Sequence, residues 1–424
     1  MSVVVDAEHL DLARFLRRGD RIVWSQACGE PISVVEALLA QAGSIGDLSA
    51  FAATSFSGVI DGPAADKLQI DSLGAIASVR PGTHKRPLGI VPTHLSQVAQ
   101  LIETGLIGCD VAIVQVSPPD ANGEHSFGLT HDYVRTAVAK ARVVIAEVNE
   151  KVPFTFADAT LPSACIDCAV RTSRGPLETP PAPPGEVDLA IARRVAGYIG
   201  DGAVVQTGIG ATPEAILREL SDRRDLGIQS GMLGDGVVDL IEAGVVTNAL
   251  KPIDRGVSIA GVLMGTRRLY DFADRNPKLA MRSTDYTHNP AVLSRIPNLV
   301  AVNSALEVDL TGQVNAEQSG ELYIGRTGGQ VDFVRAAAAS PGGRSIIALP
   351  STARGGELSR IVGRLSGPVT TARSDADLVV TEFGAAELKG QTLTERARRL
   401  VAIAHPQFRE ALDRSAWEIA RRGF

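Results

Sequence analysis

The chain has 424 residues, of which 45% are hydrophobic and 21% are charged, a composition typical of a globular protein with room for two domains. Its formal net charge of −6 argues against nucleic acid or an anionic membrane surface as the main partner, although a local basic patch can still bind a phosphorylated cofactor. No stretch approaches the roughly 18 uninterrupted apolar residues that a membrane-spanning helix needs.

The N-terminus and the cysteines favour a reducing cytoplasm. The first 20 residues carry acidic side chains early and lack a basic region followed by an apolar run, so they do not predict a signal peptide. There are four cysteines, Cys28, Cys109, Cys165 and Cys168, and such sparse usage is typical of cytoplasmic proteins. Cys165 and Cys168 form one C-x-x-C, without the second pair or nearby histidines of a zinc site. We therefore interpret the cysteines as incidental.

Strand and helix patterns alternate in the first half. Residues 110–118, DVAIVQVSP, and 142–149, RVVIAEVN, predict buried strands, and residues 132–141 between them predict a helix. The stretch 55–62, SFSGVIDG, lacks the first glycine of a G-x-S-x-G elbow. A Ser-His-Asp hydrolase is therefore not expected.

A proline-rich segment divides the chain. Residues 174–188, RGPLETPPAPPGEVD, contain five prolines, which sustain neither a helix nor a central strand and favour an extended connection. We expect an N-terminal domain over 1–182 and a C-terminal domain over 183–424.

The second half repeats the alternation. Strands are predicted over 202–210, 344–350 and 377–384, and helices over 212–220 and 237–244. The likeness between DVAIVQVSP and DLVVTEFG hints that the halves share a topology. We predict two α/β domains with largely parallel sheets.

A G-x-G turn lies in VVQTGIGATPEAIL, residues 204–217, after a strand and before a helix. Thr212 is the expected N-cap and Pro213 suits the first helical position. The backbone N–H groups at such a helix start can hold a phosphate or an oxyanion. The alternative is a tight turn only, and the third glycine of a dinucleotide fingerprint is missing.

Two further glycine-rich stretches precede regular structure. YIGRTGGQVDFVRAA, residues 323–337, places three glycines before a helical run, which lets the backbone approach a ligand closely. Arg326 and Arg335 add positive charge there. In LPSTARGGELSRIV, residues 349–362, Arg354 either meets a phosphate or carbonyl group or is a solvated loop arginine. A plain glycine-rich connection remains the alternative for the first stretch.

No metal site is expected. The histidines considered show no pair at helical metal spacing and no H-E-x-x-H; they are His84, His94, His125, His131, His288 and His405.

The motifs, taken in chain order, resemble the acetyl-CoA hydrolase/transferase family, whose members include 4-hydroxybutyrate CoA-transferase and butyryl-CoA:acetate CoA-transferase. The resemblance covers nearly the whole chain. The stretches that carry it are VQVSPPDANGEHSFGL (114–129), VIAEVNEKVP (144–153), GIGATPEAI (208–216), LGDGVVDLIEAGVVTN (233–248), NSALEVDLTGQVNAE (303–317), GGQVDF (328–333), LPSTARGG (349–356) and VVTEFGAAELKGQTLTERARRLVAIAHPQFRE (379–410).

The resemblance implies two similar open α/β domains with the active site between them, and a homo-oligomer, dimer or tetramer. It implies coenzyme A as co-substrate and acyl-CoA esters and small carboxylic acids as substrates, with no metal. In such enzymes a glutamate attacks the thioester, an acyl-glutamyl anhydride forms, and the thiolate attacks it to give a glutamyl-CoA thioester. The second carboxylic acid then enters and the steps reverse. The anhydride conserves the energy of the thioester.

The resemblance also assigns site residues. Asn289, in DYTHNPAVL, and the backbone N–H of Gly329 match the donors that bind the oxyanion; the alternative for Asn289 is a turn residue before Pro290. Arg354 matches a CoA-contacting position that is usually lysine. The other matched CoA-binding positions are Gly208, Ile209, Gly210, Ala211, Thr212, Gly325, Gly328 and Gly329.

The sequence departs from the family at the nucleophile. The family reads His-Thr-Glu or His-Ser-Glu before M-x-x-D-G, and this chain has Gln229, Ser230 and Gly231. Gly231 therefore occupies the position of the catalytic glutamate. Three interpretations remain: another acid, Asp235 or Glu317, takes over; water enters and hydrolysis results; or the chain binds CoA esters without turnover. We expect Asp235 to cap the following helix and Glu317 to support its loop.

Overall fold

The computed structural model describes residues 3–75 and 88–422. Its contacts divide the chain into two compact units. Unit 1 comprises Met1–Pro180, Gly231–Asp235 and Ile259–Thr287, and unit 2 comprises Pro181–Ser230, Gly236–Ser258 and His288–Phe424. The main passage from one unit to the other falls between Pro180 and Pro181, inside the proline-rich segment. The chain then returns to unit 1 twice, which no local sequence pattern indicates.

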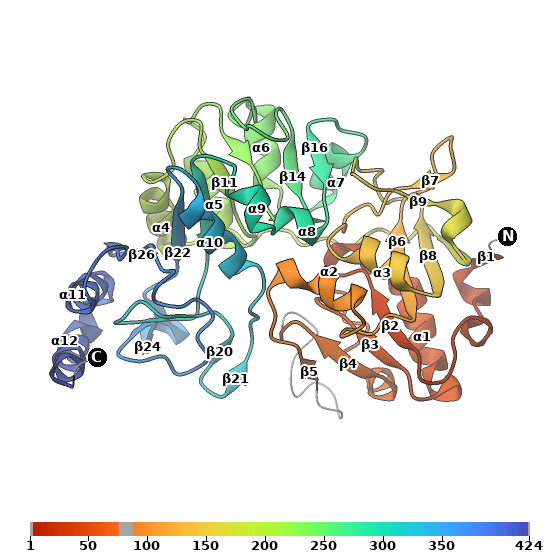
Figure 1. Ribbon diagram of the computed structural model, residues 1–424, viewed down its shortest axis with the longest axis horizontal. Coiled ribbons are helices and arrows are strands. Elements are labelled where there is room, and N and C mark those ends of the chain that lie inside the picture. Colours follow the sequence, from red (N-terminus) through yellow and green to blue (C-terminus); the bar gives the residue numbers. More distant parts are fainter. Residues whose placement is uncertain (1–2, 76–87, 423–424) are drawn as a thin grey trace. The chain divides into compact units, whose positions relative to one another are not determined.

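Unit 1 is built on an eight-stranded sheet in the order β1-β10-β8-β6-β2-β3-β4-β5 (Figure 1). Every neighbouring pair in it is parallel. The strands are β1 (Val3–Asp6), β2 (Arg21–Trp24), β3 (Ser49–Phe51), β4 (Gln69–Ser72), β5 (Gly89–Ile90), β6 (Val111–Val116), β8 (Val143–Asn149) and β10 (Cys168–Thr172). Short pairs in the same unit are β7 (Glu124–His125) with β9 (Leu161–Pro162), and β13 (Met232–Leu233) with β15 (Val262–Leu263).

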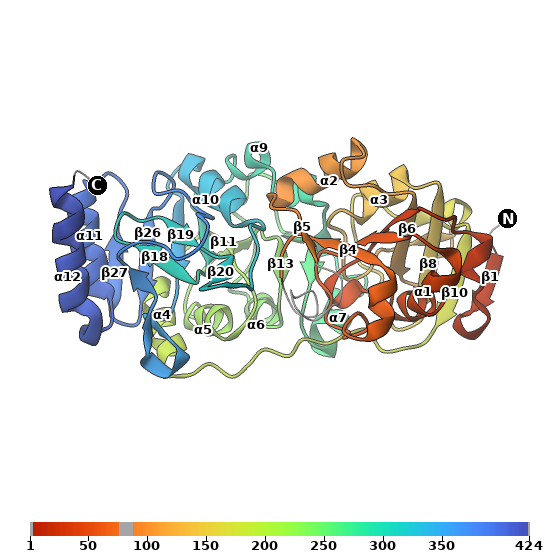
Figure 2. The same ribbon diagram turned by 90° about the horizontal axis from the view of Figure 1, so that it is seen from below.

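Helices cover both faces of this sheet. They are α1 (Ile32–Ile45), α2 (Leu95–Glu103) and α3 (Val134–Lys140). The unit also contains α7 (Arg267–Ala273) and α8 (Thr284–Thr287). Because side chains alternate along a strand, Ile22 of β2 packs in one core cluster with Leu38 of α1, and Val23 packs in another with Val98 of α2. Figure 2 shows α1 on one side of the sheet and α2 and α3 on the other.

Unit 2 is built on a six-stranded sheet in the order β12-β11-β17-β22-β26-β27. All pairs are parallel except the last, β26 with β27. The strands are β11 (Val204–Gln206), β12 (Gly227–Ile228), β17 (Leu299–Asn303), β22 (Arg344–Ala348), β26 (Leu378–Thr381) and β27 (Gly384–Glu387). Smaller strands of this unit are β18 (Glu307–Asp309) with β19 (Val314–Asn315) and β25 (Ile361–Val362), β20 (Gln318–Ser319) with β21 (Leu322–Tyr323), and β23 (Thr352–Ala353) with β24 (Leu358–Ser359). A further pair, β14 (Ser258–Ala260) with β16 (Leu279–Met281), belongs to unit 1 except for Ser258.

The helices of unit 2 also lie on both faces of its sheet (Figure 2). They are α4 (Glu186–Ala196), α5 (Ala211–Glu219), α6 (Gly236–Glu242), α9 (Pro290–Leu293), α10 (Gln330–Ala339), α11 (Leu393–Ile403) and α12 (Pro406–Arg421). Val204 of β11 and Ala301 of β17 pack against Phe333 of α10 in one core cluster. In another, Ile347 and Val379 pack with Leu400 of α11.

The predicted fold class is confirmed. Every strand and helix predicted from periodicity is present, with its ends at most four residues from the expected ones. The two sheets share a strand order: β3-β2-β6-β8-β10 in unit 1 corresponds to β12-β11-β17-β22-β26 in unit 2. The two stretches whose likeness suggested this, 110–118 and 377–384, hold β6 and β26, so they occupy the third and fifth places of that order rather than equivalent ones.

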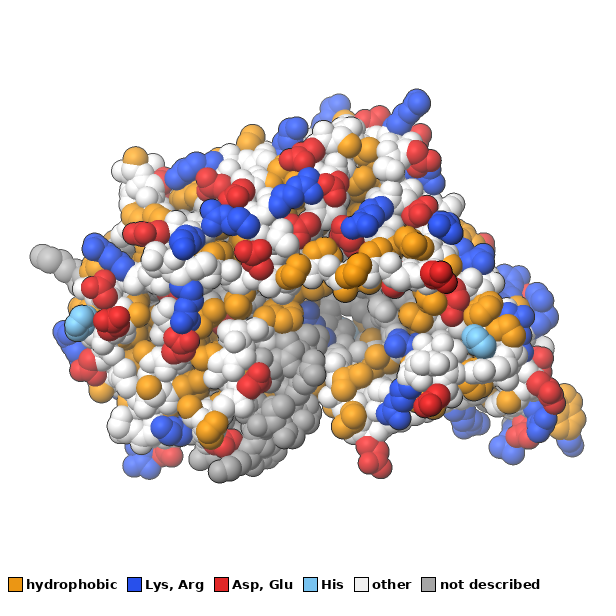
Figure 3. Space-filling view, turned by 180° about the vertical axis from the view of Figure 1, so that it is seen from behind, with side chains coloured by type: hydrophobic (Ala, Val, Ile, Leu, Met, Phe, Trp, Pro, Cys, Tyr) orange, Lys and Arg blue, Asp and Glu red, His pale blue; other side chains and the backbone are white. Residues whose placement is uncertain are grey.

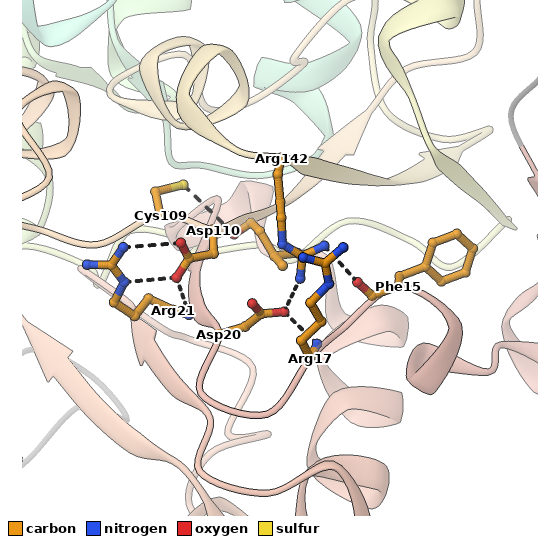
Figure 4. A network of polar contacts seen from close by, with 8 residues as sticks. Phe15, Arg17, Asp20, Arg21, Cys109, Asp110 and Arg142 are labelled. Atoms are coloured by element: carbon orange, nitrogen blue, oxygen red, sulfur yellow. Dashed lines mark hydrogen bonds and ion pairs between the residues drawn. The ribbon is translucent and has the colours of Figure 1, made fainter.

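Ion pairs fix the amino ends of strands in unit 1 (Figure 4). The guanidinium of Arg21, the first residue of β2, donates to both carboxylate oxygens of Asp110, which precedes β6, and the Arg21 backbone N–H donates to the same carboxylate. These bonds hold the pKa of Asp110 below its ordinary value. Arg142, before β8, donates to one carboxylate oxygen of Asp20. On the molecular face shown in Figure 3, acidic and basic side chains are interspersed. No helix in the described ranges is long and apolar enough to cross a membrane.

Glu147 is a fully buried carboxyl in the middle of the same sheet. Burial raises its pKa from 4.5 to about 7, against the opposing effect of hydrogen bonds from Val34 and Ser33. Gln115 is its register partner on β6, and the Oε1 of Gln115 has no hydrogen-bond partner within the described residues. Side chains directly opposite on neighbouring strands are within reach of each other. The protonated carboxyl can therefore donate to that oxygen.

We expect Glu147→Gln to stabilise unit 1 at pH 8 by about 3 kcal/mol of unfolding free energy. A carboxyl whose pKa is raised by folding does not lower the free energy of unfolding at a pH below its unfolded pKa of 4.5. It lowers that free energy progressively as the pH rises to about 7. The amide is neutral at every pH and keeps a donor for Gln115. The gain should therefore shrink to under about 1 kcal/mol at pH 5. Urea unfolding followed by the fluorescence of Trp24, which is buried in this unit, measures it.

Asp110→Asn is the control of opposite sign. Its pKa is lowered by folding, so the charged carboxylate stabilises the fold above its unfolded pKa, and that stability is lost as the pH falls. The variant should lose stability at pH 8, by less than about 1 kcal/mol because the pair is partly exposed. If Glu147→Gln destabilised unit 1 at pH 8, the ionised carboxylate would not carry the cost in stability that its burial and raised pKa indicate.

Candidate functional site

The candidate site in unit 2 lies at the carboxyl end of its parallel strands, where open α/β sheets bind ligands. The loop after β11 carries Gly208 to Gly210, and the segment after β22 leads to Arg354. The N-termini of two helices, α9 and α10, belong to the same unit. Helix N-termini present backbone N–H groups without intrahelical acceptors, so they attract anionic oxygen.

The Gly208–Thr212 turn enters α5 through a glycine. Gly210 is the N-cap and has φ 111°, a conformation that side-chain-bearing residues rarely adopt. The prediction of Thr212 as the N-cap was wrong: Thr212 is the second residue of the helix, and its hydroxyl donates to Asp188 of α4. Ile209 is 36% exposed, so the turn is accessible.

Gly329 is the N-cap of α10. Gly328 before it has φ 58°, and a side chain there would press on Arg326, whose Cγ would lie 3.3 Å from the added Cβ. The glycine pair thus lets the arginine lie against the backbone at the start of a ten-residue helix. This concentrates the partial positive charge of the helix start and a guanidinium in one place.

Asn289 is the N-cap of α9, and its Oδ1 accepts from the backbone N–H of Ala291 at 2.9 Å. The adjacent His288 packs edge-to-face on Phe333 of α10, with ring centroids 4.9 Å apart, and the Phe333 N–H donates to the Gly329 carbonyl. Unit 2 therefore brings the starts of α9 and α10 together. Burial lowers the pKa of His288 to about 3, helped by the charge of Arg326, so its imidazole is neutral.

Gly325 lies where only a glycine fits. A Cβ on it would be 2.0 Å from the carbonyl oxygen of Ala316, and the N–H groups of Ile324 and Gly325 both donate to the Glu317 carbonyl. The Glu317 carboxylate accepts 2.7 Å bonds from the hydroxyls of Tyr323 and Thr370. Glu317 therefore supports its loop, as expected from the sequence.

Arg354 begins a short 3-10 turn, Arg354–Gly356, after β23. It is exposed and has φ 49°, and Gly355 and Gly356 after it also have positive φ. The turn places an exposed cationic side chain at the carboxyl side of β22, which suits an anionic partner such as a phosphate.

The Gln229–Gly231 stretch follows β12. Ser230 is fully buried and its hydroxyl donates to the Thr207 carbonyl at 2.9 Å, which leaves it unsuited to be a nucleophile. Gly231 belongs to unit 1, where its carbonyl accepts from the N–H groups of Gly261 and Val262 at 3.1 Å. The chain passes between the units at the Ser230–Gly231 bond.

Asp235 also belongs to unit 1, and its role differs from the one expected. Both carboxylate oxygens accept from the backbone N–H of Thr266, and Oδ1 also accepts from the Thr266 hydroxyl. These bonds hold the residue before α7 rather than the amides that open α6. A carboxylate occupied in this way is a poor substitute nucleophile.

No group of His, Cys, Asp and Glu that could hold a metal ion occurs in the described ranges. Cys165 is exposed and Cys168 is buried in β10, and both are free thiols. His84 lies outside the described residues.

Sequence reasoning missed a set of amide side chains at the strand ends of unit 2. Gln206 ends β11 and Asn303 ends β17, and the Asn303 Nδ2 donates to the Gln206 Oε1 at 3.1 Å. The available signal was a polar residue closing each apolar run, VVQ and LVAVN. Such a residue at the carboxyl end of a buried strand faces the ligand edge of the sheet.

Comparison with known proteins decides the family. The N-terminal domain model of acetyl-CoA hydrolase/transferase matches residues 6–172, and the C-terminal domain model matches residues 265–416. The chain is 41% identical over 396 residues to the 4-hydroxybutyrate coenzyme A transferase of Clostridium kluyveri, which covers 92% of both chains. The chain belongs to the acetyl-CoA hydrolase/transferase family.

Solved structures agree with this assignment. RipA from Yersinia pestis is 35% identical, with a TM-score of 0.93 over 99% of this chain and 98% of that one. The 4-hydroxybutyrate CoA-transferase from Porphyromonas gingivalis is 33% identical, with a TM-score of 0.85 over 100% and 98%. The family resemblance inferred from the motifs is thus confirmed, and the chain is an enzyme of this family.

Proposed function

We propose that the protein acts on acyl-CoA thioesters and transfers CoA between an acyl-CoA and a small carboxylic acid. The observation that carries the proposal is the pairing of two helix starts in unit 2, through His288 and Phe333, in a chain that matches a CoA transferase over 92% of its length. The Asn289 amide and the Gly329 N–H then serve as donors to the thioester oxygen as negative charge develops on it.

The same edge supplies the proposed CoA contacts. The turn from Gly208 through Ile209, Gly210 and Ala211 to Thr212 gives backbone N–H groups, and Gly325 and Gly328 allow close approach of the backbone. Arg354 contributes a positive charge for the phosphates of CoA, because a guanidinium pairs with phosphate in a bidentate way. No metal enters the chemistry.

Hydrolysis is the second candidate, and a specific observation favours it. Gly231 has no side chain to attack the thioester, and the two carboxylates considered as replacements, Asp235 and Glu317, are occupied by hydrogen bonds within their own loops. Without a covalent nucleophile, water is an available acceptor. Binding of CoA esters without turnover is the third outcome.

Product analysis by mass spectrometry separates these functions. The pure protein is incubated with a panel of acyl-CoA esters, with and without acetate. A new CoA ester that forms only with acetate supports transfer, and free CoA without acetate supports hydrolysis. Bound esters without products indicate a binding protein. If the protein neither binds an ester nor forms a product, the proposal is overturned.

The sequence and the family also lead to expectations for the location and the oligomeric state of the enzyme. We expect a cytoplasmic homo-oligomer, dimer or tetramer, that uses free CoA esters and needs neither nucleic acid nor a membrane. Sedimentation of the pure protein measures the oligomeric state.

A further inference from the structure

Gln229 is a buried amide without a partner. It is 0% exposed, and neither its Nε2 nor its Oε1 makes a hydrogen bond to any described residue. Buried polar groups in folded proteins are nearly always paired, and an unpaired one calls for an explanation such as an ordered water or a ligand. Gln229 replaces the histidine that the family resemblance leads one to expect, so the question is specific to this chain.

The strand register places Gln229 in a row of amides. Val205 pairs with Ile228, and the Gln229 N–H continues the ladder to the Val205 carbonyl at 3.2 Å, so Gln206 is opposite Gln229. Asn303, two residues beyond the partner of Gln206 on β17, donates to the Gln206 Oε1. Three amides therefore cross three neighbouring strands on one face of the sheet.

That face is the one covered by α9 and α10, because Val204 and Ala301 pack against Phe333 there. The first residue of α10, Gln330, is also buried and its Nε2 is also without a partner within the described residues. The hydroxyl of Thr207, next after Gln206, is a third such group. The unpaired groups thus belong to the carboxyl ends of β11 and β12 and to the start of α10, the helix whose N-cap is the proposed oxyanion donor Gly329.

The chemistry of these groups defines their partner. Gln229 offers both a donor and an acceptor, so an alkyl group satisfies neither and a carboxylate satisfies only the donor. Water satisfies both kinds of group, and the complete burial of Gln229 favours the smallest such partner.

We propose that Gln229 holds and orients a water molecule that attacks the thioester in this chain. The inference rests on the second candidate of the proposed function, hydrolysis of acyl-CoA, in which water takes the place of the carboxylic acid. Gln229 is a positioning residue: its Oε1 accepts one O–H of the water and turns a lone pair of the water oxygen towards the acyl carbon.

The step balances without any further reagent. The water oxygen forms a bond to the acyl carbon, and the carbonyl oxygen becomes an oxyanion that Asn289 and the Gly329 N–H stabilise. The carbon–sulfur bond then breaks and its electron pair leaves with sulfur. One water proton goes to the thiolate and the other is released as the carboxylic acid ionises, which gives a carboxylate, CoA thiol and a proton. Because an amide is no base, the reaction is slow compared with covalent transfer.

Gln229→Leu, with Gln229→Met as a second variant of similar length, tests the proposal. We expect kcat for release of free CoA to fall at least about tenfold for every acyl-CoA that the wild type cleaves. The dissociation constant for acyl-CoA should stay unchanged, and the urea midpoint by circular dichroism should not fall, since replacing an unpaired buried amide by an apolar group removes no hydrogen bond within the protein. In H₂¹⁸O, the wild-type product carries one labelled oxygen.

Gln115→Leu is the matched control: this buried amide of unit 1 donates to the Glu30 carbonyl, so its loss should lower stability and leave kcat unchanged. An unchanged kcat in both Gln229 variants, a loss confined to one class of acyl group, or a lowered urea midpoint overturns the inference. A wild type that transfers CoA but releases none overturns the inference alone. A wild type that neither transfers, cleaves nor binds acyl-CoA overturns the proposed function as well.

Discussion

Replacement of Gly231 by glutamate should give this chain a covalent enzyme–CoA intermediate and a rate of CoA transfer at least a thousandfold higher than that of the wild type. Loss of a covalent nucleophile costs on the order of a million-fold, while an oxyanion site and binding alone keep roughly a thousandfold over water. The rest of the proposed site is present in unit 2. Intact-protein mass spectrometry after incubation with an acyl-CoA detects the glutamyl-CoA adduct, and product analysis gives the rate.

A second variant separates the effect of the nucleophilic carboxylate from the effect of side-chain length. Gly231→Gln has the same length and no nucleophilic carboxylate, so it should form no adduct. The double variant Gln229→His, Gly231→Glu restores the His-Ser-Glu pattern and should be at least as active as Gly231→Glu. An adduct on the wild-type protein would contradict the argument, because it would mean that another carboxylate already attacks the thioester. The hydrogen bonds to Asp235 and Glu317 make those two residues poor candidates.

The elements that the sequence predicted well are those fixed by local composition. The strands β6, β8 and β26 consist mostly of apolar, β-branched residues buried on both faces. Such runs are recognisable without knowledge of their neighbours. Family motifs then located the glycine turns, because a positive φ at Gly210 or a close backbone approach at Gly325 tolerates no side chain.

What the sequence could not predict depends on partners far along the chain. The hydroxyl of Thr212 binds Asp188 of α4 instead of capping its own helix, and Asp235 binds Thr266, 31 residues away. The unpaired state of Gln229 follows from the register of β12 with β11 and from the burial of that edge. None of these relations has a local signature, since each arises only when the sheet and its helices have assembled.

Asn289→Asp should abolish most of the activity and leave the fold intact. Aspartate is as good an N-cap as asparagine, so it keeps the acceptor for the Ala291 N–H, and its charge suits the start of α9 and its neighbour α10. It has no amide hydrogen to donate, however, and it places a negative charge where the thioester oxygen becomes negative. Loss of one oxyanion donor costs about 3 kcal/mol, roughly a hundredfold or more in kcat.

The comparison with Asn289→Ala separates the two roles of this side chain. Alanine removes the donor and the cap together, so it should lower kcat and also lower the free energy of unfolding by about 1 kcal/mol. The lower stability is measured as a lower urea midpoint. Aspartate should lower kcat alone. If aspartate left kcat unchanged, Asn289 would be only the turn residue before Pro290, and the N–H groups at the start of α10 would have to stabilise the oxyanion by themselves. If aspartate lowered kcat, one amide would serve both roles. The Asn289 Oδ1 would cap α9 and so orient the amide, and the Nδ2 would donate to the oxyanion.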